Sequence, residues 1–286
     1  MLNHLRIRII FRALRLKEQN PVLVAYLFGI LDSKILEGEN YFQIVINGSC
    51  LILISILSFF INEYTDKDTD VNRKDRDSSM LNYWEYILVS TLLIVIIILI
   101  LIISKHPLAL VVTLVVGISY SHPFTRFKKW FPLDQITLGL ACVVLPYVIP
   151  YLIAGIPLNY LTLLFLIFFL GSSNLIAVAK DIQADTKAQL RNISVVLSQK
   201  QIMRLGLMNC FCFIAIGFAI EILYNYYWYY FLFIFQGILI YAFYKGLYLC
   251  ANEIESKFIS IAAKGVIAGW VLVLFQLIII LITQFN

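Results

Sequence analysis

Long apolar runs alternate with short polar stretches along the whole chain. Runs such as 88–103 are nearly unbroken apolar sequence, long enough to span a bilayer as an α-helix. They lack the period-two alternation of membrane barrel strands. The pattern therefore predicts an all-α polytopic membrane protein. Nine transmembrane helices are expected in the bundle, at 21–36, 41–62, 83–104, 107–120, 134–154, 158–180, 205–224, 226–246 and 261–283.

Composition supports this class and adds one feature at the N-terminus. The 286 residues are 61% hydrophobic, well above the share in ordinary soluble domains. A single transmembrane domain over 1–286 is expected, with no nucleic-acid partner. Within 1–18, four arginines (Arg6, Arg8, Arg12 and Arg15) alternate with apolar residues, which predicts a basic amphipathic helix on an anionic membrane surface.

Lysines and arginines test the arrangement of spans. With a cytoplasmic N-terminus, only Lys34 and Lys105 of the 22 basic residues fall on the outer side. Basic residues gather on the cytoplasmic side of membrane proteins, and a wrong number of spans would scramble the split. The sequence therefore predicts an integral, multi-pass protein of a prokaryotic cell membrane, with its N-terminus in the cytoplasm.

Two acidic stretches end the second and sixth predicted spans, both on the cytoplasmic side. In "NEYTDKDTD", Asn62, Asp66 and Asp70 are four residues apart, which places them on one stripe of a helix. In "DIQAD", Asp181 and Asp185 have the same spacing. A single acidic loop is ordinarily a solvated helix cap, but two matching stripes on one side of the membrane favour a shared site.

Paired carboxylates at this spacing suit Mg²⁺. This hard ion keeps several waters and is held by one or two carboxylates together with substrate phosphates. The sequence therefore predicts Mg²⁺ as the cofactor and a diphosphate as its partner. Four cations are candidates for the remaining phosphate charge: Arg126, Lys128, Arg73 and Lys187. Arg73 and Lys187 are equally well explained as ordinary cytoplasmic-side residues.

The two acidic stretches and "YSHPFTRFK" (120–128) together resemble motifs of one family. The first acidic stretch is similar to the N-D-x-x-D-x-x-x-D signature of the UbiA superfamily of intramembrane prenyltransferases, and the second to its D-x-x-x-D. The segment 120–128 is similar to a Y-S-x-P-P-x-R/K-x-K stretch between the fourth and fifth helices of several members. Glu63 stands where the family usually has Asp, and we do not expect it to be a close metal ligand.

The resemblance covers essentially the whole chain and implies an activity. The implied reaction is Mg²⁺-dependent transfer of a prenyl group from a prenyl diphosphate to a lipophilic acceptor, within membrane lipid and at the cytoplasmic edge. Metal ligation is implied for Asn62, Asp66, Asp70, Asp181 and Asp185. Arg126 and Lys128 are the implied diphosphate ligands. Tyr120 faces the carbocation or the diphosphate, unless it packs as an ordinary helix-end residue.

Other functions remain open at this stage. A terpene cyclase of the same superfamily ionises a prenyl diphosphate without using an acceptor, and no local sequence feature separates it from a transferase. A cation transporter is a more remote alternative, because transporters usually place ion ligands near the midplane of the membrane. The acceptor can be an aromatic quinone precursor, a polyene or a lipid. The sequence fixes neither the length of the prenyl chain nor the oligomeric state.

Overall fold

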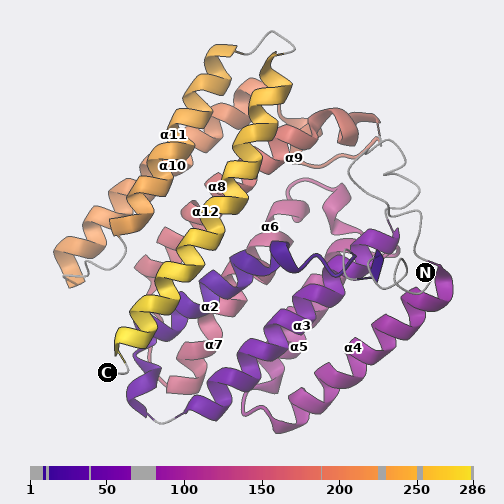
Figure 1. Cartoon of the computed structure of the whole chain (residues 1–286), viewed down its shortest axis with the longest axis vertical. Coiled ribbons are helices and arrows are strands. Elements are labelled where there is room, and N and C mark those ends of the chain that lie inside the picture. Colours follow the sequence, from indigo (N-terminus) through magenta and orange to yellow (C-terminus); the bar gives the residue numbers. More distant parts are fainter. Residues whose placement is uncertain are drawn as a thin grey trace. The chain divides into compact units, whose positions relative to one another are not determined.

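The structure, a computed structural model, describes residues 9–10, 13–38, 40–65, 82–187, 189–224, 230–249 and 254–284. Every element in these ranges is a helix (Figure 1). The longer helices are α2 (Asn20–Ser33), α3 (Tyr41–Thr65), α4 (Tyr83–Ile103), α5 (Pro107–Ser121), α7 (Leu145–Ala154), α8 (Tyr160–Lys187), α10 (Gln199–Tyr224), α11 (Tyr230–Leu249) and α12 (Ile254–Gln284). The short ones are η1 (Leu16–Gln19), η2 (Ile35–Gly38), η5 (Phe127–Lys129), α6 (Leu133–Gly139), η6 (Leu140–Val144) and α9 (Ile193–Val196).

Helices occupy all nine regions that the hydropathy pattern predicts. Within the described residues, six are long and apolar enough to cross a bilayer: Tyr41–Thr65, Tyr83–Ile103, Leu133–Ala154, Tyr160–Ile182, Gln199–Tyr224 and Ile261–Thr283. Three shorter apolar helices lie at the remaining places: Asn20–Ser33, Pro107–Ser121 and Leu232–Tyr248. The prediction of an all-α, multi-pass membrane protein is confirmed, and the number of nine spans stays a prediction.

Two predicted spans differ from the helices observed. The span predicted at 21–36 ends as an α-helix at Ser33, because Lys34 takes a left-handed conformation (φ 50°) and caps the helix through its N–H on the Leu31 carbonyl. The span at 134–154 is not one regular helix, since the π-turn η6 separates α6 from α7. Pro146 follows that wide turn; a proline has no N–H to donate, and its ring crowds the preceding turn of a regular helix.

The chain divides into two compact units, and the first is Met1–Ile156. In this unit α3 packs against both α4 and α5, and α2 packs against α7. Gly117 brings α5 close to α3, because a Cβ at this position would lie 2.5 Å from Ser58 Oγ. Such small residues let helix backbones approach closely in a membrane, where packing rather than water exclusion drives association.

In the second unit, Pro157–Asn286, the four long helices among the described residues form a bundle. Helix α8 packs against α10, α10 against α11, α11 against α12, and α12 against α8 (Figure 1). Phenylalanines fill the interior, and the rings of Phe165 and Phe213 stack with their centroids 4.2 Å apart. The bundle holds α8 as one helix that continues past its apolar part to Lys187, so the second acidic motif is helical.

Candidate active site

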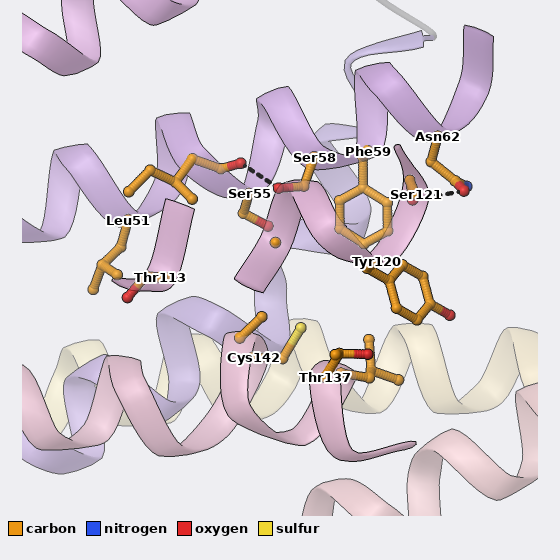
Figure 2. A pocket seen from close by; sticks show the side chains of 14 residues that line it. Leu51, Ser55, Ser58, Phe59, Asn62, Thr113, Tyr120, Ser121, Thr137 and Cys142 are labelled. Carbon is orange, nitrogen blue, oxygen red and sulfur yellow. Dashed lines mark hydrogen bonds between the residues drawn. The ribbon is translucent and has the colours of Figure 1, made fainter. Parts of the chain in front are cut away.

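A cavity lies between α3, α5 and the α6–η6 segment of the first unit (Figure 2). Its wall is mostly apolar and includes Leu51, Ile54, Leu138 and Ala141. Polar groups gather at the end where α3 finishes: Asn62, Tyr120 and Ser121. The volume is about 50 Å³. The cavity is therefore a narrow apolar slot with one polar end.

Asn62 is the centre of a buried polar cluster at that end. The Lys128 ammonium donates a hydrogen bond to Asn62 Oδ1 at 2.6 Å, and Ser121 Oγ donates to the same oxygen at 2.9 Å. All three residues are at least nine-tenths buried. Thr65 Oγ1 links the end of α3 to the end of α5. It donates to the carbonyls of Asn62 and Ser121, each at 3.2 Å. We call Asn62, Thr65, Ser121, Arg126 and Lys128 the Asn62 cluster.

The chain after α5 turns sharply to bring Lys128 into the Asn62 cluster. Helix α5 ends at Ser121, where His122 takes an extended conformation. Arg126 then adopts a left-handed backbone (φ 43°), and the short helix η5 follows at once. Such a backbone is uncommon outside glycine, so it marks a turn that the surroundings hold. Arg126 also reaches back to α3, with Nη2 3.5 Å from the Thr65 carbonyl oxygen.

Glu63, next to Asn62, has a partner from the start of the chain. Arg15 donates to Glu63 Oε2 from Nε at 2.9 Å and from Nη2 at 2.8 Å. The Arg15 guanidinium also lies 5.8 Å from the ring centroid of Phe59, which lines the cavity. Glu63 is thus engaged by a cation, and the expectation that it is not a close metal ligand stays a prediction. Arg15 lies against α3, whereas Arg6, Arg8 and Arg12 lie outside the described residues, so the amphipathic helix on a membrane surface stays a prediction.

The second acidic motif lies on α8 of the second unit. Asp181 and Asp185 are one helical turn apart, on the same side of the helix. Asp181 is partly exposed and Asp185 is buried. Asp185 Oδ2 accepts hydrogen bonds from Asn192 Nδ2 at 2.9 Å and from Ser194 Oγ at 2.6 Å. Asp185 therefore also holds the turn between α8 and α9.

The other predicted site residues fall into two groups. Asp66, Asp70 and Arg73 lie outside the described residues, so their contacts stay a prediction. Tyr120 lines the polar end of the cavity, and Lys187 is the exposed last residue of α8.

The described carboxylates suit a divalent metal in part. Asp181 and Asp185 supply hard oxygen donors one turn apart, as Mg²⁺ requires. Within the described part of the chain, no group of three or more His, Cys, Asp or Glu side chains forms a closed metal cage.

A third buried polar group, in the first unit, escaped the sequence analysis. The hydroxyls of Tyr147 and Tyr151 on α7 both donate to Asp32 Oδ2 on α2, each at 2.5 Å. The two tyrosines are four residues apart, so they share one face of α7. The sequence does hold a signal for this contact between α2 and α7. An Asp lies within one apolar run, and two tyrosines lie four residues apart in a later apolar run. An ionisable residue inside a membrane span usually has a polar partner.

The helices and the polar-ended cavity define a multi-pass membrane protein with a charged site at the end of a spanning helix. The chain belongs to the UbiA prenyltransferase family, which its sequence matches over residues 37–263. No curated protein matches the sequence.

Solved structures share this fold. One is a digeranylgeranylglyceryl phosphate synthase, with a TM-score of 0.64 and 15% identity over 96% of this chain and 97% of that one. A UbiA homolog from Archaeoglobus fulgidus, bound to GPP and Mg²⁺, has a TM-score of 0.62 and 17% identity over 93% and 99% of the two chains. A UbiA homolog from Aeropyrum pernix K1 has a TM-score of 0.63 and 14% identity over 91% and 98%. At such low identity the likeness establishes the fold alone.

Proposed function

We propose that the protein transfers a prenyl group from a prenyl diphosphate to a lipophilic acceptor within the membrane. The observation that carries this proposal is the buried Lys128 ammonium, which donates a hydrogen bond to Asn62 at the polar end of a largely apolar cavity. A prenyl diphosphate has the matching form, with dense negative charge at one end and an apolar chain behind it. Membership of the UbiA prenyltransferase family supports the class of reaction.

The apolar chain of the substrate is proposed to lie in the cavity beside α3. At about 50 Å³ the cavity is smaller than the engineered cavity of roughly 150 Å³ that admits benzene in another protein. A prenyl chain therefore enters only if lining side chains move. Phe59 and Tyr120 lie at the polar end of the cavity (Figure 2), and we propose that rotation of either ring widens it.

The reaction begins with heterolysis of the bond between C1 of the prenyl group and the diphosphate oxygen. The electron pair leaves with the diphosphate, and an allylic cation remains. Lys128 and Arg126 stabilise the charge that develops on the departing oxygens. The aromatic faces of Phe59 and Tyr120 stabilise the cation, and the apolar wall keeps water away from it. The acceptor then gives an electron pair to C1 and releases one proton.

Asp181 and Asp185 are the described residues proposed to hold the metal, with Asp66 and Asp70 as the ligands predicted from the first motif. When bound, Mg²⁺ supplies positive charge that makes the diphosphate a better leaving group. UbiA homologs from Archaeoglobus fulgidus have been solved with Mg²⁺ together with GPP or DMAPP. Those complexes support a divalent metal in this family. The assignment of both acidic motifs to one diphosphate is a prediction from the sequence.

We further propose that the chain works as one catalytic domain whose active site faces the cytoplasm of a prokaryotic cell. The placement of the basic residues supports this orientation. Single cysteines introduced at Lys129 and Lys187, in an otherwise cysteine-free chain, should react with an impermeant maleimide only from the cytoplasmic side. A cysteine introduced at Lys105 should react only from the outer side. Labelling of either of the first two from outside would contradict the orientation.

The decisive experiment identifies the products. Purified protein in lipid nanodiscs is incubated with Mg²⁺, radiolabelled geranyl, farnesyl or geranylgeranyl diphosphate, and a panel of hydroxybenzoate, naphthoate, polyene and glycerol-phosphate lipid acceptors. We expect release of diphosphate together with one prenylated acceptor, identified by mass spectrometry. A cyclic hydrocarbon formed without acceptor would favour the terpene cyclase. No turnover of any prenyl diphosphate, with cation flux in liposomes, would favour the transporter and overturn the proposal.

A further inference from the structure

Helix α8 ends in a reversal of the chain that is built around Asp185. Gln189 adopts a left-handed backbone (φ 53°). The Leu190 N–H donates to the Asp185 carbonyl at 3.1 Å, and the Gln189 N–H donates to the Thr186 carbonyl at 3.1 Å. These two bonds are those of a Schellman motif, which ends a helix and satisfies its last carbonyls. The same turn that reverses the chain therefore also fixes the backbone of Asp185.

The returning chain brings two donors to the Asp185 carboxylate. Ser194 Oγ lies 2.6 Å from Asp185 Oδ2, Asn192 Nδ2 lies 2.9 Å from it, and both donate to this oxygen. Ser194 Oγ also lies 2.6 Å from Asn192 Oδ1. A hydroxyl has one proton to give, and the charged carboxylate is the stronger acceptor. Ser194 and Asp185 are both buried, so water competes little for these bonds.

Asn192 occupies a position where an asparagine ordinarily has another partner. It is the N-cap residue of α9, and an N-cap side chain usually accepts a hydrogen bond from a backbone N–H two or three residues later. The Asn192 side chain makes no such bond and is directed to Asp185 instead. The orientation of Asn192 thus favours the carboxylate over the helix that this residue begins.

We infer that Asn192 and Ser194 are positioning residues that orient the Asp185 carboxylate for the metal ion. The inference rests on the proposed function of this site. Both donors bind Oδ2, which directs metal coordination to Oδ1. Because both donors are neutral, they orient the carboxylate without cancelling the charge that attracts a cation. Carboxylates that bind metals are commonly held by such hydrogen bonds, and loss of the partner weakens metal binding by about ten- to a hundredfold.

The test measures metal binding separately from diphosphate binding. Mn²⁺ affinity is determined by electron paramagnetic resonance on purified protein in nanodiscs, saturated with geranyl S-thiolodiphosphate, an analogue that ionises slowly. Affinity for the analogue alone is determined calorimetrically in EDTA. The variants are Asn192→Ala and Ser194→Ala, each made in the wild type and in an Asp185→Ala background.

Two control variants match these changes in residue type but lie elsewhere in the second unit. Ser173 is another buried serine, on α8, whose hydroxyl bonds to its own helix. Asn159 is another asparagine at a helix start, and its Oδ1 accepts from the N–H groups of Leu161 and Thr162. Ser173→Ala and Asn159→Ala should keep Mn²⁺ affinity within about twofold of the wild type, whatever their effect on the thermal midpoint.

We expect Asn192→Ala and Ser194→Ala each to lose about tenfold in Mn²⁺ affinity, with unchanged metal-free affinity for the analogue. The Mg²⁺ concentration that gives half-maximal turnover should rise by a similar factor, while the rate at saturating Mg²⁺ stays near that of the wild type. In the Asp185→Ala background neither change should lower the affinity further, because the carboxylate that the two residues orient is gone. This coupling separates a positioning role from general support of the turn.

Three results would overturn the inference while leaving the proposed function standing. One is wild-type Mn²⁺ affinity in both Asn192→Ala and Ser194→Ala. Another is an equal loss from these changes with and without the Asp185 carboxylate, which would assign both residues to the turn alone. The third is unchanged Mn²⁺ affinity in Asp185→Ala itself. If the wild type binds neither Mn²⁺ nor the analogue, the proposed function and this inference fall together.

Discussion

Helix α3 carries two buried asparagines, Asn47 in its first half and Asn62 in its last turn, and their surroundings differ. Asn47 is fully buried and contacts only uncharged groups: its Nδ2 donates to the Gln43 carbonyl at 2.7 Å, and its Oδ1 accepts from Ser104 Oγ at 2.9 Å. Asn62 holds an ammonium group and lines a cavity. One residue type on one helix thus meets two kinds of environment.

The difference separates a structural polar group from a functional one. Around Asn47, the Gln43 side chain accepts from the Lys105 backbone and donates to the Ile103 carbonyl, so the network closes the turn between α4 and α5. Such a satisfied network stabilises a fold and offers a ligand no opening. Around Asn62, a buried charge lies one hydrogen bond from the wall of a cavity. Burial and hydrogen bonding alone would not distinguish the two asparagines; the charge and the cavity do.

The largest effect should come from the acidic motif on α8. Asp181→Ala removes a carboxylate proposed to hold the metal, and turnover of prenyl diphosphate should fall by at least about a thousandfold. The thermal midpoint should change little, because Asp181 is partly exposed. Initial rates at saturating Mg²⁺, with Asn47→Ala as the control, measure this. Near-normal turnover would remove Asp181 from the site.

A smaller loss is expected from the cation that Asn62 binds. Lys128→Met keeps the apolar part of the side chain and removes the charge, so kcat/KM for prenyl diphosphate should fall about a hundredfold. Lys129→Met changes the next cation along η5 and should remain near the wild type. Equal losses in the two variants would show that the loop acts through general positive charge and not through the Asn62 cluster.

Asn47→Ala should show the opposite pattern. The change leaves Ser104 and the Gln43 carbonyl without their partner, which should cost about 1–3 kcal/mol of stability. The thermal midpoint in detergent should fall, while kcat/KM per folded molecule stays close to the wild type. A selective loss of activity at unchanged midpoint would break the distinction between the two asparagines.

Glu63→Asp should have the smallest effect. It restores the acid typical of the family, but the shorter arm no longer reaches Arg15, which should cost about 1 kcal/mol. Mg²⁺ dependence of turnover should be unchanged, because the Glu63 carboxylate is paired with Arg15. A clear gain in apparent Mg²⁺ affinity would instead place residue 63 among the metal ligands.

The sequence predicts the helices well and their contacts poorly. Apolar runs of spanning length reveal the helices because the bilayer imposes that length locally. The DIQAD spacing likewise predicts that Asp181 and Asp185 share one helix, as α8 shows. The contact between Asn62 and Lys128 joins positions 66 residues apart. This contact depends on the packing of α5 against α3 and on the left-handed turn at Arg126. No local sequence pattern predicts either of them.

Two further contacts have the same origin. From the sequence, Arg15 is predicted to be one more cation of a membrane-surface helix. Only the fold brings it to Glu63, 48 residues away. Asp32 lies within a predicted span, yet its tyrosine partners come from a helix that starts more than 100 residues later. Periodicity predicts which face a residue occupies on its own helix, whereas a partner on another helix is set by tertiary packing.

The central claim is that prenyl diphosphate binds with its charged end at the Asn62 cluster and its chain in the cavity beside α3. A geranyl diphosphate analogue with a diazirine at the far end of its chain tests this most directly. After photolysis in nanodiscs, peptide mapping should place the label on cavity residues of α3, α5 or α6–η6, such as Leu51, Thr113 or Leu138. Unlabelled geranyl diphosphate should prevent labelling, and Lys128→Met should reduce it. Saturable labelling confined to α10, α11 or α12 would contradict the account.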